Sequence, residues 1–265
     1  MSELRLVVCM KVVPKPEEVR VDRMTWRLDR ARARAEMNPP DMNALEMALA
    51  LKDIHAGRVT ILSMGPPSFE PYLRLGLAMG ADHVCLLSDA MFGGADTLAT
   101  TYTLAAGIRK LGGADLIFCG EESSDGATGQ VPPGLAEWLD LPQITLATQV
   151  SLDAAAGTLR GRREIFGGHE VLEMPIPAVV SVKAACNEPR FMDYRRKPWA
   201  FETGQVTVWD REDLNAEDSR IGVAGSPTVV SGLDEAAVRE RRREFLHGTP
   251  DEIARALLER LDRGA

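Results

Sequence analysis

The sequence lacks the features of membrane and nucleic-acid-binding proteins. No apolar run approaches the roughly 18 residues of a membrane-spanning helix, and no secretory leader precedes the first apolar segment. Positive charge is not in excess either, because 31 Lys and Arg stand against 39 Asp and Glu, for a net charge of −8. This balance argues against nucleic acid or an anionic membrane as the main partner. We therefore expect a cytoplasmic protein without membrane insertion.

Signatures of metal sites and catalysis are also scarce. The four cysteines are scattered without a CxxC pair, and Cys9, Cys85 and Cys119 lie in apolar runs, where a thiol packs as a small hydrophobe. The four histidines are scattered too, and neither a GxxxxGK[ST] loop nor a GxGxxG motif is present. We predict no metal site and no catalytic residue, so a bound cofactor would have to carry out any reaction.

Apolar runs and helical periods alternate as far as about Leu141. Each apolar run is nearly continuous, as in a strand buried on both faces. The expected strands are Leu4–Met10, Val59–Met64, Val84–Leu87 and Asp115–Gly120, and the expected helices start at Asn38, with Asn38 as cap, and cover Tyr72–Met79, Leu98–Leu111 and Leu135–Leu139. The alternation predicts an α/β fold with a doubly wound parallel sheet. The polar stretch from Pro14 to Glu36 is interpreted as a hairpin excursion.

The pattern changes after Leu141. Short segments with polar alternation predict an antiparallel extension of the sheet. These segments are Thr145–Leu152, Thr158–Ile165, His169–Met174 and Ala178–Val182. We expect a nucleotide-binding domain over residues 1–186, with the extension starting at about residue 145.

Residues 187–265 are expected to form a C-terminal arm. No convincing helix occurs between Asn187 and Gly225, whereas Thr249 can cap a final helix over Pro250–Arg263. Such an arm could embrace a partner subunit or fold back on its own domain, and the sequence leaves both interpretations open.

Five loops follow the carboxyl ends of the predicted strands or begin the next helix. In open α/β sheets, ligands bind beyond these ends. The most informative loop follows the strand that ends at Gly120 and runs through Ser123–Val131 into a helix. Its small residues leave the backbone N–H groups of the helix N-terminus open to a phosphate or another anion. The alternative is an ordinary strand–helix turn with an Asp or Thr cap.

At these residues the chain resembles the β subunit of electron transfer flavoprotein. The likeness runs almost from end to end. It rests on Val8–Lys11 with Val13-Pro14, Asn38–Glu46, Ser63–Pro66, Leu77–Asp82, Gly94–Thr100, Ser124–Gly126, Arg163–Ile165 with Gly167-Gly168, Pro177–Val180 and Asn187–Arg190. The resemblance implies a heterodimer with an α subunit that carries FAD, shuttling electrons between a dehydrogenase and an acceptor.

The family divides by what fills the nucleotide site of the β subunit. Some members hold a structural AMP, and flavin-bifurcating members hold a second FAD that NADH reduces. The Asn38–Glu46, Gly94–Thr100 and Gly225–Thr228 segments look like the second group, so FAD is the expected cofactor and AMP the alternative. The resemblance implies an adenosine pocket lined by Cys9, Lys11, Asn38, Asp41 and Met64. It also implies ribityl or phosphate contacts from Asp96, Thr97 and Thr100, and diphosphate contacts from Asp125, Gly126, Ala127, Thr128, Gly129 and Gln130.

The chain departs from the family pattern in two places. Glu121 and Glu122 replace a basic residue and a Gln, and they would repel a diphosphate unless they point away. In relatives, the loop that corresponds to Phe191–Trp199 docks the partner dehydrogenase, whose identity does not carry over. Met192 or Tyr194 could anchor that partner, and core packing of the same residues is the alternative.

Two other functional classes remain open from the sequence. A stand-alone adenine-nucleotide sensor of the universal-stress-protein kind shares a similar sheet, but it would typically end near residue 150. An ATP-cleaving ligase would carry an SGGxDS loop, of which Gly93–Thr97 lacks the leading serine.

Overall fold

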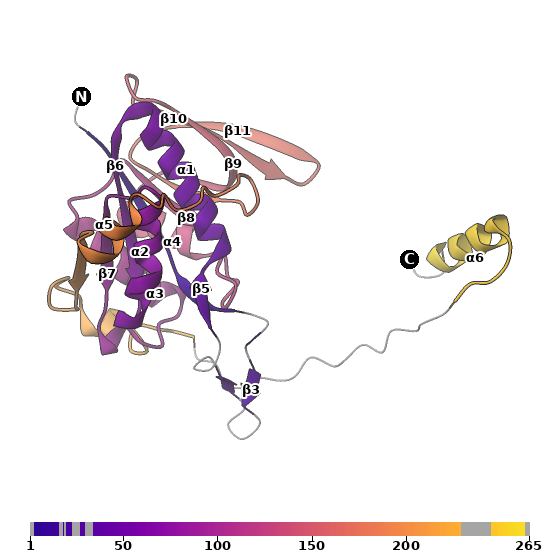
Figure 1. The fold of residues 1–265 in the computed structure, drawn as a ribbon, viewed down its shortest axis with the longest axis horizontal. Helices are drawn as coiled ribbons and strands as arrows, with labels where there is room; N and C mark the ends of the chain where they lie inside the picture. Colours follow the sequence, from indigo (N-terminus) through magenta and orange to yellow (C-terminus); the bar gives the residue numbers. More distant parts are fainter. Residues whose placement is uncertain are drawn as a thin grey trace. The chain divides into compact units, whose positions relative to one another are not determined.

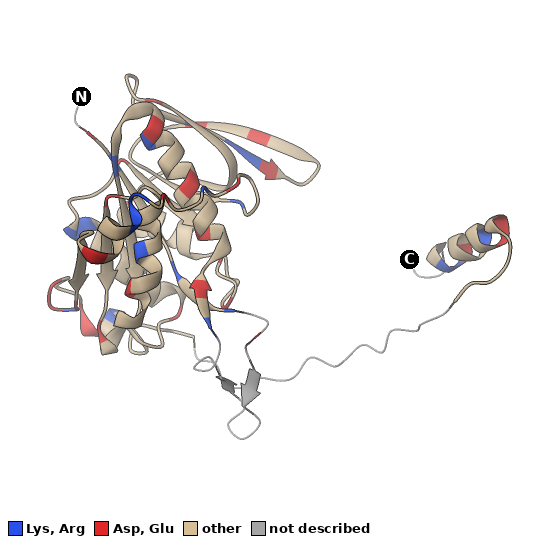
Figure 2. Cartoon of the chain, in the orientation of Figure 1, with Lys and Arg blue, Asp and Glu red and all other residues tan. Residues whose placement is uncertain are grey.

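The computed structural model describes residues 3–15, 18, 20–22, 27–29, 34–228 and 245–262. The chain forms two compact units, residues 1–231 and 232–265. Within the described ranges, no helix combines the length and the apolar character that crossing a bilayer requires. Figure 2 shows acidic and basic residues interspersed over the described elements.

A large sheet organises the first unit (Figure 1). Its described strands follow the order β11-β10-β9-β12-β8-β1-β6-β7-β13. In chain order they are β1 (Leu4–Cys9), β6 (Gly57–Met64), β7 (His83–Leu87), β8 (Leu116–Gly120), β9 (Gln143–Asp153), β10 (Thr158–Ile165), β11 (Gly168–Pro175), β12 (Ala178–Val182) and β13 (Val206–Trp209). Neighbouring strands from β9 to β13 in this order pair in parallel. Strand β10 pairs antiparallel with both β9 and β11. The expected α/β architecture is confirmed.

Helices cover both faces of the sheet, which explains the continuous apolar runs. Leu6 and Val8 of β1 pack in one core with α1 (Pro39–His55) and α2 (Glu70–Met79). Val7 and Cys9 point to the other face and pack with α3 (Thr97–Lys110) and α4 (Val131–Leu139). Since successive strand residues alternate between the two faces, both sets must be apolar.

The extension of the sheet differs from the prediction in one strand. Strands β9, β10 and β11 are antiparallel, as expected. Strand β12, however, lies between β8 and β9 and is parallel to both. Its residues are buried on both faces, so the segment belongs to the parallel core.

Residues 187–228 pack on the sheet and contain regular elements that the sequence analysis missed. Helix α5 (Lys197–Glu202) begins with Pro198 in its first turn, a position where proline is tolerated, so this residue does not break the helix. Strand β13 then pairs in parallel with β7. Residues 187–228 belong to the first compact unit, which extends to residue 231.

Short hairpins and a final helix complete the described chain. Strand β2 (Val12–Pro14) pairs with β5 (Ala35–Met37), and β3 (Arg20–Asp22) pairs with β4 (Arg27–Asp29), as the hairpin expectation required. Other parts of that stretch lie outside the described residues.

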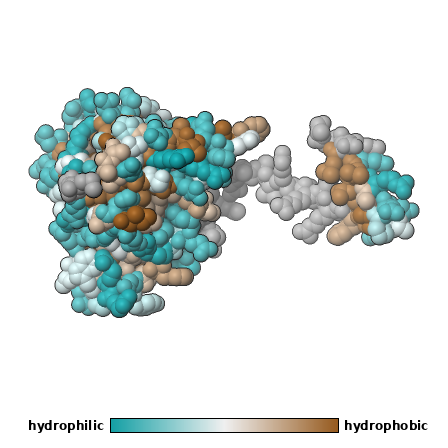
Figure 3. All heavy atoms as spheres, turned by 90° about the horizontal axis from the view of Figure 1, so that it is seen from above, coloured by the Kyte–Doolittle hydropathy of each residue, from teal (hydrophilic) through white to brown (hydrophobic). Residues whose placement is uncertain are grey.

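The expected final helix is present in the second unit as α6 (Pro250–Asp262). Thr249 and Glu252 form a capping box, in which the N–H of Thr249 donates to the Glu252 carboxylate at 2.8 Å. Apolar side chains gather on one side of α6 (Figure 3).

Candidate functional site

The loops at the carboxyl edge of the sheet are joined by hydrogen bonds. The loop that follows β8 is contacted by Lys11, shortly after β1, and by Asn38, directly before α1. Its partners lie between 84 and 114 residues earlier in the sequence, and the parallel pairing of β1 with β8 brings them to one edge. Lys11, Asn38, Asp41 and Asp125 therefore belong to one hydrogen-bond network at this edge.

Asp41 is the buried centre of this network. Its Oδ2 accepts the N–H of Lys11 at 2.8 Å, and its Oδ1 accepts the N–H of Gly120 at 3.1 Å. Burial raises the pKa of Asp41 to about 7, although these N–H groups, the Asn38 side chain and the Lys11 charge oppose the rise. Gly120 makes the contact sterically feasible, because a Cβ there would lie 2.4 Å from Asp41 Oδ1 and 2.7 Å from Pro40.

Lys11 and Asn38 hold the loop that follows β8. The Lys11 ammonium lies 2.6 Å from Asp125 Oδ1 and 3.5 Å from Ser123 Oγ. Asn38 donates to the carbonyl of Glu122 at 2.9 Å and accepts the N–H of Ser124 at 3.1 Å. Its side chain therefore ties two loops together and makes no capping hydrogen bond to α1, contrary to the sequence prediction.

The turn over residues 123–130 presents backbone donors at its end. The N–H groups of Gly126 and Ala127 donate to the carbonyl of Ser123, so they are engaged within the turn. Among the described residues, none accepts a hydrogen bond from the N–H group of Thr128 or Gly129, and both residues are exposed. Gly129 has φ +63°, a conformation that favours glycine. An anion would therefore meet donors at 128–129 rather than at 126–127.

Helix α4 contributes fewer donors than its N-terminal position suggests. Pro132 and Pro133 occupy its first turn, and proline has no N–H group. The N–H of Gln130 has the Thr128 hydroxyl 3.4 Å away. Gln130 itself is exposed. The turn before the helix, more than the helix itself, supplies the candidate anion site.

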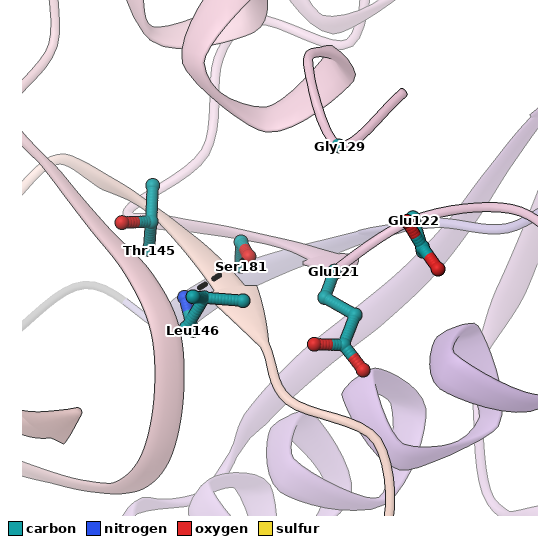
Figure 4. A pocket seen from close by; sticks show the side chains of 6 residues that line it. All are labelled: Glu121, Glu122, Gly129, Thr145, Leu146 and Ser181. Carbon is teal, nitrogen blue, oxygen red and sulfur yellow. Dashed lines mark hydrogen bonds between the residues drawn. The ribbon is translucent and has the colours of Figure 1, made fainter. Parts of the chain in front are cut away.

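The two glutamates that depart from the family pattern point away from this turn. Glu121 Oε1 accepts the N–H of Ala184 at 3.0 Å. Figure 4 shows the Glu121 and Glu122 carboxylates on the side away from Gly129. A cavity of about 320 Å³ lies between these elements, lined by Glu121, Glu122, Gly129, Thr145, Leu146 and Ser181.

Asp96 and its neighbours have structural partners. Asp96 Oδ1 accepts the N–H groups of Leu98 and Ala99 and so caps α3. Its Oδ2 accepts the N–H and the hydroxyl of Thr228, at 3.1 and 2.7 Å. Although burial opposes it, these hydrogen bonds hold the pKa of Asp96 below its ordinary value. Its carboxylate therefore fastens residue 228 to the start of α3.

Thr97 is the residue of this group that reaches the turn. Its hydroxyl lies 3.4 Å from that of Thr128, whereas Thr100 is half-buried one turn further along α3. Cys9 is buried in the core beside Cys119, its register partner in β8, and Met64 packs against the same core. The expected ribityl, phosphate and adenosine contacts of these residues stay predictions.

The start of α1 also anchors the segment that follows β12, a role that sequence reasoning missed. The side chains of Asn43 and Asn187 each donate to the other residue's backbone carbonyl, at 2.8 and 3.0 Å. Arg190 donates to both Glu46 oxygens and to Asp53. Two features of the sequence could have indicated this contact. Each segment contains an asparagine, and the two segments carry opposite charges.

The anchored segment places the two expected docking residues differently. Met192 is partly buried and packs against the core under α1 and α2. Tyr194 is 76% exposed and lies beside the Lys197 ammonium, 5.7 Å from the ring centre. Phe191 is also exposed. An outward aromatic surface thus exists on this segment, and Met192 faces inward.

Comparisons with known proteins agree with the residue pattern. A family model for the electron transfer flavoprotein domain matches residues 25–214. The chain is 43% identical over 227 residues to the electron transfer flavoprotein subunit beta of Clostridium acetobutylicum, covering 86% of each chain. It is 39% identical over 264 residues to Protein FixA of Azorhizobium caulinodans, covering 96% of this chain and 92% of that one.

A third relative is the caffeyl-CoA reductase-Etf complex subunit CarD of Acetobacterium woodii. The identity is 36% over 259 residues, covering 97% of this chain and 98% of the relative. Because the family model spans most of the chain and these relatives align over nearly their whole length, the chain belongs to the electron transfer flavoprotein family and is one of its β subunits.

Proposed function

We propose that this β subunit binds FAD at the carboxyl edge of its sheet and works with an α subunit in electron transfer. The observation that carries the proposal is the turn over residues 123–130. Its Thr128 and Gly129 N–H groups have no acceptor among the described residues, and its flanking carboxylates point away. Such a cradle suits the phosphates of an adenine nucleotide.

The residues present fit a dinucleotide. Thr128 and Gly129 would hold the diphosphate, with the Thr97 hydroxyl beside them. The Asp125 carboxylate does not oppose this role, since Lys11 pairs with it at 2.6 Å. When bound, FAD supplies the redox chemistry, which agrees with the lack of an acid–base pair in the sequence. The chain's own part is to bind and orient the nucleotide.

Partner contacts belong to the same proposal. The exposed aromatic residues Phe191 and Tyr194 would meet a dehydrogenase, and the apolar side of α6 would meet the α subunit. Leu257, Leu258 and Leu261 are each more than half exposed on this helix. A lone helix of this length is only marginally stable in water, so a partner surface would stabilise it.

Replacing Gly129 with valine tests the nucleotide site. The change forces a β-branched residue into a left-handed conformation and moves the donors of the turn. The matched control is Gly157→Val, because Gly157 has φ +66° in a turn with open space around it. Both variants carry a similar backbone strain, and only Gly129→Val alters the turn over residues 123–130.

The assay is nucleotide released from the purified α–β complex and identified by chromatography. We expect two FAD per wild-type heterodimer, one in the Gly129→Val complex and two in the Gly157→Val complex. One FAD and one AMP in the wild type would support the structural-AMP alternative and remove the case for bifurcation. Equal nucleotide content in both variants would contradict the assignment of the turn. A stable monomer that binds ATP without an α subunit would favour a nucleotide sensor.

A further inference from the structure

A buried carboxylate beneath the nucleotide turn has a role that differs from the expected pocket lining. We propose that Asp41 is a positioning residue that fixes the turn over residues 123–130 without touching the nucleotide. The inference rests on the proposed function, since it concerns the same site. It assigns to the ionised carboxylate the task of holding two strand ends in the geometry that the phosphates need.

The geometry of Asp41 leaves its carboxylate oxygens engaged by the protein. One oxygen accepts the N–H of Lys11 and the other that of Gly120, and the residue is only 7% exposed. Lys11 follows β1 by two residues and Gly120 is the last residue of β8, and these neighbouring strands lead into loops of the site. The carboxylate therefore clamps the two strand ends together and faces the backbone rather than a ligand.

Further contacts carry this clamp to the turn. Lys11 is fixed by Asp41 through its backbone, and its ammonium then holds Asp125 at 2.6 Å. From the same end of α1, Asn38 holds the backbone at Glu122 and Ser124. The chain is thus held along residues 120–125, and Gly126 and Ala127, which donate to Ser123, link it to the donors at 128 and 129. A shift at Asp41 moves those donors.

Protonation of Asp41 would weaken the clamp. A carboxylate offers acceptors on both oxygens, whereas a carboxylic acid turns one oxygen into a donor that faces a backbone N–H. The charged and titratable groups around it are Lys11, which favours the ionised form, and the buried thiols Cys9 and Cys119. The Cys119 thiol has its pKa raised well above the ordinary value by its contact with Cys9 and by burial, so it stays neutral. Nucleotide binding should therefore weaken as the pH falls through 7.

Asp41→Asn is the decisive variant, and Asp82→Asn is its matched control. Asparagine keeps the shape but presents one acceptor and one donor to two N–H groups. Asp82 likewise accepts a strand N–H, from Val59, and pairs with Lys52, but it lies before β7, away from the carboxyl edge. The full chain, first freed of nucleotide, is titrated with FAD and separately with AMP at pH 6 and pH 8. Thermal melts check that each variant is folded.

For wild type and the Asp82→Asn variant, we expect binding about tenfold weaker at pH 6 than at pH 8, the effect of about one lost charge-assisted hydrogen bond. The Asp41→Asn variant should bind weakly at both pH values. The diphosphate of FAD does not titrate near pH 7, whereas the phosphate of AMP does. The pH dependence of FAD binding therefore reports on Asp41 without a contribution from phosphate ionisation.

Asp41→Asn binding that matches wild type in strength and pH profile would overturn the inference and leave the proposed function intact. Failure of the wild type to bind either nucleotide at any pH would overturn the proposed function, and the inference with it. If Asp41→Asn does not fold, Gly120→Ala replaces it. Its methyl group would displace the Asp41 carboxylate, and unchanged binding would also overturn the inference.

Discussion

The free energy of unfolding should carry a pH signature of Asp41. The pKa of this carboxyl rises from its ordinary 3.8 to about 7, with burial as the main cause. A rise of this size corresponds to about 4 kcal/mol, at 1.36 kcal/mol per pH unit. Burial disfavours the ionised form by more than the N–H groups of Lys11 and Gly120 favour it, so the folded pKa lies above the unfolded one. The stabilising contribution of the protonated carboxyl is therefore complete below about pH 4 and is lost as the pH rises through about 7, even though the ionised form makes the better hydrogen bonds.

The Asp41→Asn variant isolates this term, because every other titrating group cancels in the difference between the two proteins. The unfolding free energy of wild type minus that of the variant should fall by about 3 kcal/mol from pH 5 to pH 8. Urea unfolding followed by tryptophan fluorescence at several pH values measures it. A difference that is flat or rises with pH would refute the reasoning, since it would mean that burial does not disfavour the ionised carboxylate.

Three further predictions concern other parts of the chain. Asp96→Ala removes the cap of α3 and should lower the unfolding free energy by about 1–2 kcal/mol, and an unchanged urea midpoint would contradict this role. Arg190→Ala should speed proteolysis near residues 187–196, whereas Arg195→Ala, at an exposed side chain, should not; equal cleavage rates would argue against the anchor. Leu261→Asp on α6 should weaken capture of the α subunit about tenfold or more, because the apolar face would be buried in the complex. Glu259→Ala is the surface control, and undiminished capture by the Leu261→Asp variant would exclude this face.

Local patterns in the sequence were sufficient for most of the sheet. The run Leu6–Cys9 is apolar at every position because both faces of β1 are covered, so its burial could be predicted without knowing its neighbours. The parallel placement of β12 could not, because its direction depends on pairing with β8 and β9. Strand β13 has four residues, and a segment that short gives little periodic signal.

Individual roles at the site were harder to predict than its location. The loop after Gly120 could be assigned from its small residues and its position after a buried strand. The role of Asp41 could not, because its two partners lie 30 and 79 residues away in sequence. Likewise Asn43 and Glu46 share a motif with Asp41 but contact residues 187 and 190, each 144 residues further along the sequence.

The central claim is that the turn ending at Thr128 and Gly129 holds the phosphates of a nucleotide. A crystal structure of the α–β complex, with the phosphorus positions located in the density, tests it most directly. We predict a diphosphate within hydrogen-bond distance of the Thr128 and Gly129 N–H groups, above an Asp41 carboxylate that still accepts from Lys11 and Gly120. A nucleotide bound elsewhere, with those N–H groups facing only solvent, would contradict the account.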